Sequence, residues 1–196
     1  MAIKSDREYR MASVEFRAKE EDEQKYIVEG YATTFNDPYV LYTYDGVDYK
    51  EEVDRRALDG ADMSDVIFLY NHEGMVFARM SNGTLKLEAD EKGLRVWADL
   101  SLTEDSRKLY EAIRTGLVTQ MSWAFTVEED KYNEKEHLRT LLKIRKAYDV
   151  SAVSIPADPA TSISARAYFD GVIEEQRRRD LEREKQKQRI RIKSMR

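Results

Sequence analysis

The sequence has no cysteine, three prolines and two histidines among its 196 residues. Without cysteine there are neither disulfides nor thiolate metal ligands, which favours a reducing compartment. The charged N-terminal residues lack the apolar core of a secretory signal, and no apolar run approaches the ~20 residues of a membrane span. The sequence therefore predicts a soluble, cytoplasmic protein with no membrane partner.

Glycine is also scarce, and its eight residues are scattered. They form neither GxGxxG nor GxxxxGK[ST], so the loops that cradle phosphates are absent. The pair His72-Glu73 is not followed by a second histidine one helical turn later, so the HExxH zinc motif is absent as well. We therefore expect no cofactor and no metal ion.

Charge is unevenly distributed along the chain. Residues 174–196 contain ten Lys or Arg and five Asp or Glu, a net charge of +5. Because the whole chain has a net charge of −5, residues 1–173 have a net charge of −10. An acidic body argues against a general nucleic-acid surface, and the tail lacks interleaved aromatics for base stacking. We expect a flexible N-terminus at 1–11, a folded domain at 12–170, and a charged helical or disordered tail at 171–196, with no specific nucleic-acid partner.

Short stretches with period-two alternation dominate the body, and they predict β-strands. The expected strands are 11–17, 25–35, 39–44, 47–49, 66–70, 75–80, 84–89, 93–100, 120–127, 138–147 and 148–155. Asp45-Gly46 and Asn82-Gly83 have the composition of tight hairpin turns.

Helices are expected at two places in the body. Thr103 is a good N-cap for a helix that ends at Gly116, with an apolar stripe facing the core. Residues 51–60 are compatible with a second, short helix, and the charged residues 128–136 indicate a mobile loop. Together these elements predict a β-rich α+β fold: a partly closed, mostly antiparallel β-barrel with helices packed outside it.

Ser122 lies in the middle of the expected strand 120–127, whose large apolar residues alternate onto one face. Ser122 falls on the other face, where its neighbours are small or polar, including Ala124. Such a face leaves open space in front of the hydroxyl, which a nucleophile attacking a polypeptide carbonyl needs. The alternative interpretation is that Ser122 simply faces solvent.

A serine nucleophile needs a base and a group that orients the base. His72 directly follows the buried strand 66–70, where a rigid scaffold meets a loop. His137 lies in a charged loop and is expected to be solvated. Asp149 interrupts an otherwise apolar segment, where a carboxylate is costly unless it is paired. Glu73 adjoins His72 and points to the opposite face. The alternative for Asp149 is a strand-edge residue facing water.

Three segments in this order, residues 70–73, 109–125 and 148–160, resemble the prohead maturation proteases of tailed phages. These are serine peptidases with the herpesvirus assemblin-like fold, and the resemblance covers roughly residues 12–168. It implies that His72 is the general base, Ser122 the nucleophile and Asp149 the group that orients the histidine.

The resemblance also implies a biological setting. The protein would lie inside the immature capsid, in the cytoplasm of the bacterial host, as a homodimer or higher oligomer. It would cleave scaffolding segments of the major capsid protein and also itself, and its tail would be a docking or self-removed segment. The alternative function is a catalytically inactive capsid-assembly protein that keeps the protease fold. An esterase or unrelated hydrolase with the same triad is a third hypothesis.

Overall fold

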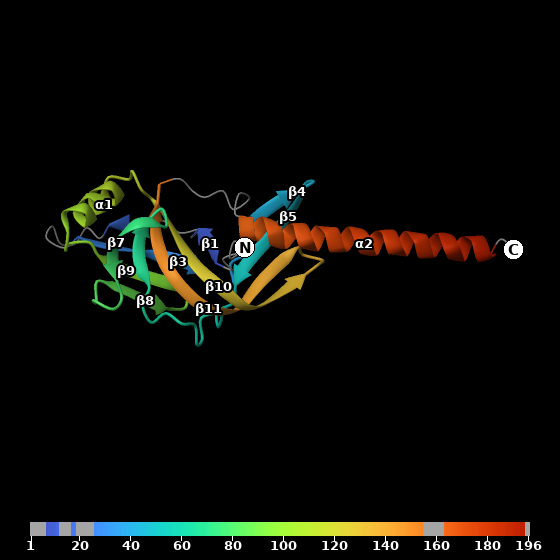
Figure 1. Cartoon of the computed structure of the whole chain (residues 1–196), viewed down its shortest axis with the longest axis horizontal. Helices are drawn as coiled ribbons and strands as arrows, with labels where there is room; N and C mark the ends of the chain where they lie inside the picture. Colours follow the sequence, from blue (N-terminus) through green and yellow to red (C-terminus); the bar gives the residue numbers. More distant parts are fainter. Residues whose placement is uncertain (1–6, 12–16, 19–25, 155–162, 195–196) are drawn as a thin grey trace, which may run out of the picture.

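The computed structural model describes residues 7–11, 17–18, 26–154 and 163–194 (Figure 1). Within these ranges the chain forms eleven strands and two helices. In order they are β1 (Glu8–Met11), β2 (Arg17–Ala18), β3 (Ile27–Thr34), β4 (Tyr39–Tyr44), β5 (Val47–Val53), β6 (Ile67–Tyr70), β7 (Glu73–Arg79), β8 (Leu85–Ala89), β9 (Gly93–Asp99), α1 (Glu104–Arg114), β10 (Gln120–Asn133), β11 (Leu138–Val153) and α2 (Ile163–Ser194). The predicted β-rich α+β class is confirmed.

Two sheets carry the strands. The larger one has seven strands, in the order β1-β10-β11-β5-β4, with β6 also paired to β11 and β7 paired to β6. The smaller one has the order β2-β3-β9-β8. All pairs are antiparallel except those that β11 makes with β5 and with β6. The sheets are therefore mostly antiparallel, as predicted.

The predicted barrel is not supported, because the described strands do not close on themselves. The physical reason lies in β11, one edge of which is covered by β10 along its length. The other edge is divided between two short parallel partners: Leu138–Leu141 pair with β5, and Asp149–Ala152 pair with β6. The large sheet forks at β11 and does not curl round to join its ends.

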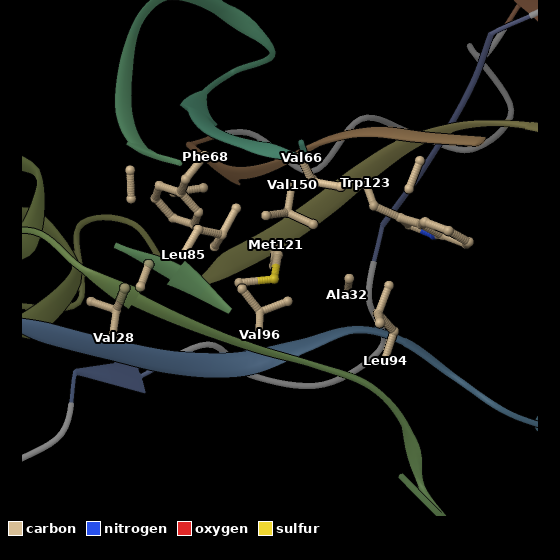
Figure 2. Packing of buried hydrophobic residues seen from close by; sticks show 14 of the residues in the cluster. Val28, Ala32, Val66, Phe68, Leu85, Leu94, Val96, Met121, Trp123 and Val150 are labelled. Carbon is tan, nitrogen blue, oxygen red and sulfur yellow. The ribbon is translucent and has the colours of Figure 1, made fainter. Parts of the chain in front are cut away.

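The core lies between the two sheets. Figure 2 shows Met121 and Val150 of the large sheet facing Val96 of the small one, and all three are fully buried. Each such side chain contributes roughly 1.5–3 kcal/mol when it is removed from water. This packing fixes β10 and β11 against the small sheet, and therefore fixes the residues that project from their other faces.

Helix α1 follows the sequence prediction closely. The Thr103 hydroxyl accepts a hydrogen bond from the Ser106 backbone N–H, and Leu109 and Ile113 are buried. Gly116 follows the helix with a positive φ of 75°. Leu117, which continues the apolar spacing of Leu109 and Ile113, lies beyond the helix end and is exposed.

Two local predictions are wrong because strand pairing overrides local sequence preference. Residues 51–60 are not a helix: β5 continues to Val53 beside β11, and residues 55–60 form successive turns. Residues 128–136 are not a mobile loop, since β10 continues through Asn133 and pairs with β11. Cross-strand ion pairs such as Lys143 with Glu128 account for its charged composition.

Of the two predicted hairpins, the one at Asp45-Gly46 is confirmed, with both residues at positive φ between β4 and β5. At Asn82-Gly83 the chain does turn, and Gly83 has a φ of 79°. However, β7 pairs with β6 and β8 pairs with β9. The turn therefore passes the chain from one sheet to the other and does not close a hairpin.

The two ends of the chain differ from their expected boundaries. The segment expected to be a flexible N-terminus, 1–11, includes β1, which pairs with β10. Helix α2 passes through the expected boundary at residue 171 without a break. Its Phe169 and Ile173 are buried against the β4–β5 hairpin, and beyond them the exposed residues 177–190 project away from the sheets (Figure 1).

Gly93→Ala is expected to lower the free energy of unfolding by about 2–3 kcal/mol. An added Cβ would lie 2.0 Å from the Thr33 carbonyl oxygen on the paired strand β3, where backbone cannot give way. Gly171→Ala is the control: no atom lies within 4 Å of its added Cβ, and alanine favours an exposed helix by about 1 kcal/mol over glycine. Urea unfolding compares the variants, and unchanged stability of Gly93→Ala would contradict this packing.

Candidate active site

His72 lies in the two-residue turn that joins β6 to β7. Tyr70 pairs with Glu73, and the two residues between them, Asn71 and His72, have positive φ values of 53° and 60°. Non-glycine residues adopt this conformation at a cost, and asparagine tolerates it better than most. The strand before the turn is buried, so the prediction that His72 lies where a core strand meets a loop is confirmed.

The turn is held in place by its neighbour β11. The Asn71 backbone N–H donates to the Ala152 carbonyl at 2.9 Å, and the Asn71 side-chain oxygen accepts from the Ser154 backbone N–H at 3.1 Å. These bonds tie the tip of the β6–β7 hairpin to the end of β11. They compensate for the strained backbone and fix the direction of the histidine ring.

Three adjacent strands bring the predicted residues together. Ser122 on β10 pairs with Ser151 on β11, which in turn pairs with Leu69 on β6. Asp149 stands two residues before Ser151 on the same strand and so on the same face. His72, in the turn that follows β6, therefore lies next to Ser122 and Asp149 on one face of the large sheet.

The resulting geometry is a continuous chain of polar contacts. His72 Nε2 lies 2.7 Å from Ser122 Oγ, and His72 Nδ1 lies 2.5 Å from Asp149 Oδ1. Ser122 and Asp149 are each 2% exposed, while the histidine side chain keeps 16% of its surface exposed. Ser122 therefore neither faces solvent nor lies on an open face, and Asp149 is a buried, paired carboxylate.

The partners of the ring fix where its proton lies. An ionised carboxylate only accepts hydrogen bonds, so Nδ1 carries a proton that it donates to Asp149. In the neutral ring this leaves Nε2 as an acceptor, facing the Ser122 hydroxyl. The arrangement therefore allows a proton to pass from the serine to the ring while the carboxylate holds the ring in place.

Ser151 is a fourth member of this group that the sequence analysis does not identify. It is fully buried, its hydroxyl donates to Asp149 Oδ1 at 2.9 Å, and its oxygen lies 3.1 Å from His72 Nδ1. The available sequence signal was its i+2 spacing from Asp149, which places both side chains on one face of a strand.

Strand β1 also reaches this site, which the sequence analysis does not anticipate. The Arg10 carbonyl oxygen lies 2.9 Å from Ser122 Oγ, so it competes with His72 Nε2 for the single proton of that hydroxyl. The Tyr9 ring packs edge-on against the His72 ring, with 4.7 Å between the centroids. No local pattern in the sequence points to these contacts, because they depend on β1 pairing with β10.

The other candidates lie apart from this group. His137 is half-buried in the turn between β10 and β11, where Nδ1 lies 3.1 Å from the Tyr132 hydroxyl, so it is not the freely solvated residue that was predicted. Glu73 is exposed and takes no part in orienting His72.

Among residues 7–11, 17–18, 26–154 and 163–194, no group of three or more His, Cys, Asp or Glu side chains is placed to hold a metal ion. In the same part of the chain, neither helix is long and apolar enough to cross a membrane.

Comparison with known proteins identifies the family. No curated protein and no solved structure matches the chain. A family model described as caudovirus prohead serine protease matches residues 12–172 of the 196. This range contains His72, Ser122 and Asp149, and it leaves out strand β1. Because the match spans most of the chain, the protein belongs to the caudovirus prohead serine protease family, a family of serine peptidases.

Proposed function

We propose that this protein is a serine endopeptidase of phage capsid maturation in which Ser122 is the nucleophile, His72 the general base and Asp149 the residue that orients His72. The observation that carries the proposal is the unbroken chain of contacts from Ser122 Oγ through the His72 ring to Asp149 Oδ1, at 2.7 and 2.5 Å. Family membership supports a capsid maturation protease in general.

In the proposed mechanism, Ser122 Oγ attacks the carbonyl carbon of the scissile peptide bond while its proton passes to His72 Nε2. The protonated ring then donates this proton to the leaving amine, and an acyl-enzyme remains. Water attacks the ester with His72 again acting as base, which releases the acid product and restores the serine. Asp149 stays ionised throughout and stabilises the imidazolium that forms in each step.

The proposed substrate is the scaffolding segment of the major capsid protein, cleaved inside the immature capsid in the host cytoplasm. The family supports a capsid protein as the substrate in general. The protease itself is a second proposed substrate, and a homodimer or higher oligomer is the proposed assembly.

The test is co-expression with the major capsid protein, followed by the mass of the capsid protein in assembled particles. With the wild-type protease the capsid protein should lose a terminal segment, and with Ser122→Ala it should stay full-length in particles that still assemble. Ser64→Ala, which changes an exposed turn serine hydrogen-bonded to Asp62, is the control and should cleave normally.

Two outcomes would reject the proposal. If Ser122→Ala shortens the capsid protein as the wild type does, Ser122 is not the nucleophile. If the wild type leaves the capsid protein full-length in assembled particles, the inactive assembly protein is the better account.

Ser151→Ala is expected to lower kcat about tenfold, with KM changed by less than about twofold. The hydroxyl contacts Asp149 and the His72 ring but not the bound peptide in this mechanism, so its loss misplaces the base and leaves binding intact. Thr126→Val is a matched control, because that buried hydroxyl on β10 has no hydrogen-bond partner. Ser151→Thr, which restores a hydroxyl, should recover part of the rate. An equal fall in kcat in Ser151→Ala and Ser151→Thr would indicate a packing effect only.

A further inference from the structure

Strand β1 lies at the edge of the large sheet, next to the proposed nucleophile. It is four residues long and, among the described strands, pairs only with β10, with Met11 opposite Ser122 and Arg10 opposite Trp123. The Arg10 carbonyl oxygen lies 2.9 Å from Ser122 Oγ, within hydrogen-bond distance. A peptide backbone in extended conformation therefore already touches the hydroxyl that is proposed to attack peptide bonds.

The Arg10 side chain lies in a buried cluster of charges behind this strand, which it forms with Glu8, Glu51 and Arg139. Its Nε and Nη2 donate to the two oxygens of Glu51 at 2.6 and 3.0 Å, which is the bidentate geometry that arginine makes with carboxylates. Arg10 is 3% exposed and Glu51 is fully buried. Glu51 therefore presents both carboxylate oxygens to a guanidinium on the strand that lies along β10.

The buried charges that do not belong to β1 have other partners as well. The strand contributes one charge of each sign, Glu8 and Arg10, so its departure removes no net charge. Arg139 would lose its bonds to Glu8 at 2.9 and 3.1 Å but keep its ion pair with Asp130 at 2.8 Å. Glu51 would keep a hydrogen bond from the Tyr39 hydroxyl at 2.7 Å and one from Arg139 Nη1 at 3.1 Å. A buried carboxylate without any partner would be costly, and this arrangement avoids it.

Two further features distinguish β1 from the other strands of the sheet. The family match begins at residue 12, so β1 lies outside the part of the chain that matches the family. In addition, the Tyr9 ring packs edge-on against the His72 ring, so β1 lies beside the base as well as beside the nucleophile. Both features indicate that β1 is a segment bound in the site and not one of the strands that build it.

We propose that the edge of β10 beside Ser122 is the peptide-binding strand, that β1 occupies it within the same chain, and that Glu51 selects peptides with arginine at the position of Arg10. This inference rests on the proposed function, since it assigns the substrate class of that site. The ligand is an extended peptide that adds to β10 as an antiparallel strand, with an arginine side chain turned toward Glu51. Displacement of β1 then exposes both His72 and Ser122.

The test measures peptide binding without turnover. The protein is the full chain with Ser122→Ala, which prevents cleavage, and Arg10→Gln, which loosens β1. The probe is a fluorescein-labelled peptide with the sequence of residues 6–13, compared with the same peptide carrying Gln at the position of Arg10. The arginine peptide should bind at least about tenfold more tightly, because only it forms the charge-assisted fork with Glu51. Its binding should also accelerate hydrogen exchange at the amides of residues 8–11.

Adding Glu51→Gln should remove the preference between the two peptides. If this variant does not fold, the comparison of the two peptides on the parent protein still decides the question. Equal binding of both peptides, no binding of either, or unchanged exchange in β1 would overturn the inference. Because no step depends on catalysis, these results are independent of whether Ser122→Ala abolishes cleavage, which alone decides the proposed function.

Discussion

His72→Ala and Ser122→Ala are each expected to lower kcat/KM for a capsid-derived peptide by about 10³-fold or more, and the double variant should be no slower than either single one. The reason is that the two residues act on one proton, with 2.7 Å between His72 Nε2 and Ser122 Oγ. Removing either partner ends the nucleophilic route, so removing the second costs nothing further. Steady-state cleavage of a fluorogenic peptide measures all three variants.

The other histidine of the chain provides the control. His137 lies in the β10–β11 turn beside Tyr132 and Tyr49, and His137→Ala should change kcat/KM by less than about twofold. Losses that simply multiply in the double variant would show that His72 and Ser122 act independently. That result would contradict the proposed mechanism even if each single loss were large.

Asp149→Asn is expected to lower kcat by about 10⁴-fold while the protein stays folded. The carboxylate accepts a hydrogen bond from the Nδ1–H group of His72 at 2.5 Å and so leaves Nε2 free to act as base. An asparagine amide can present its N–H₂ group to Nδ1, which favours the tautomer with the proton on Nε2, where it blocks transfer from Ser122. The change keeps the volume of a side chain that is 2% exposed.

Asp62→Asn is the matched control, because this exposed carboxylate pairs with Lys146 on the surface. It should leave kcat unchanged within about twofold. Thermal unfolding of both variants separates a catalytic loss from a folding loss. A folded Asp149→Asn protein with near wild-type kcat would show that the carboxylate does not orient the base.

The elements that carry the site were largely predictable from the sequence, whereas their arrangement was not. The buried strand before His72 and the alternating strand around Ser122 are visible as local patterns. What brings their residues together is the parallel pairing of β6 with β11, which places Leu69 level with Ser151. The pairing of parallel strands far apart in the chain does not affect local periodicity. The sequence therefore indicates His72, Ser122 and Asp149 as candidates but not their geometry.

Ser151 and Arg10 are not identifiable from the sequence for the same reason: their roles depend on strand pairing. Ser151 is one small residue in a strand until β11 is aligned with β10, and the Arg10 carbonyl is a backbone atom that no sequence pattern distinguishes. The polar composition of residues 128–136 favours a mobile loop when that segment is considered without its partner strand. Once Glu128 faces Lys143 across the hairpin, the same charges support a strand.

The most direct test of the central claim is covalent capture of the nucleophile with a fluorophosphonate probe, followed by peptide mapping. The account predicts one adduct, on Ser122, that forms at least about 100-fold more slowly in His72→Ala. The experiment is run on the wild type and on Arg10→Gln, in which β1 is loosened. The second protein tests whether β1 keeps the probe from a reactive Ser122. An adduct on another serine, a rate that does not depend on His72, or no adduct in either protein would contradict the assignment of Ser122 as an activated nucleophile.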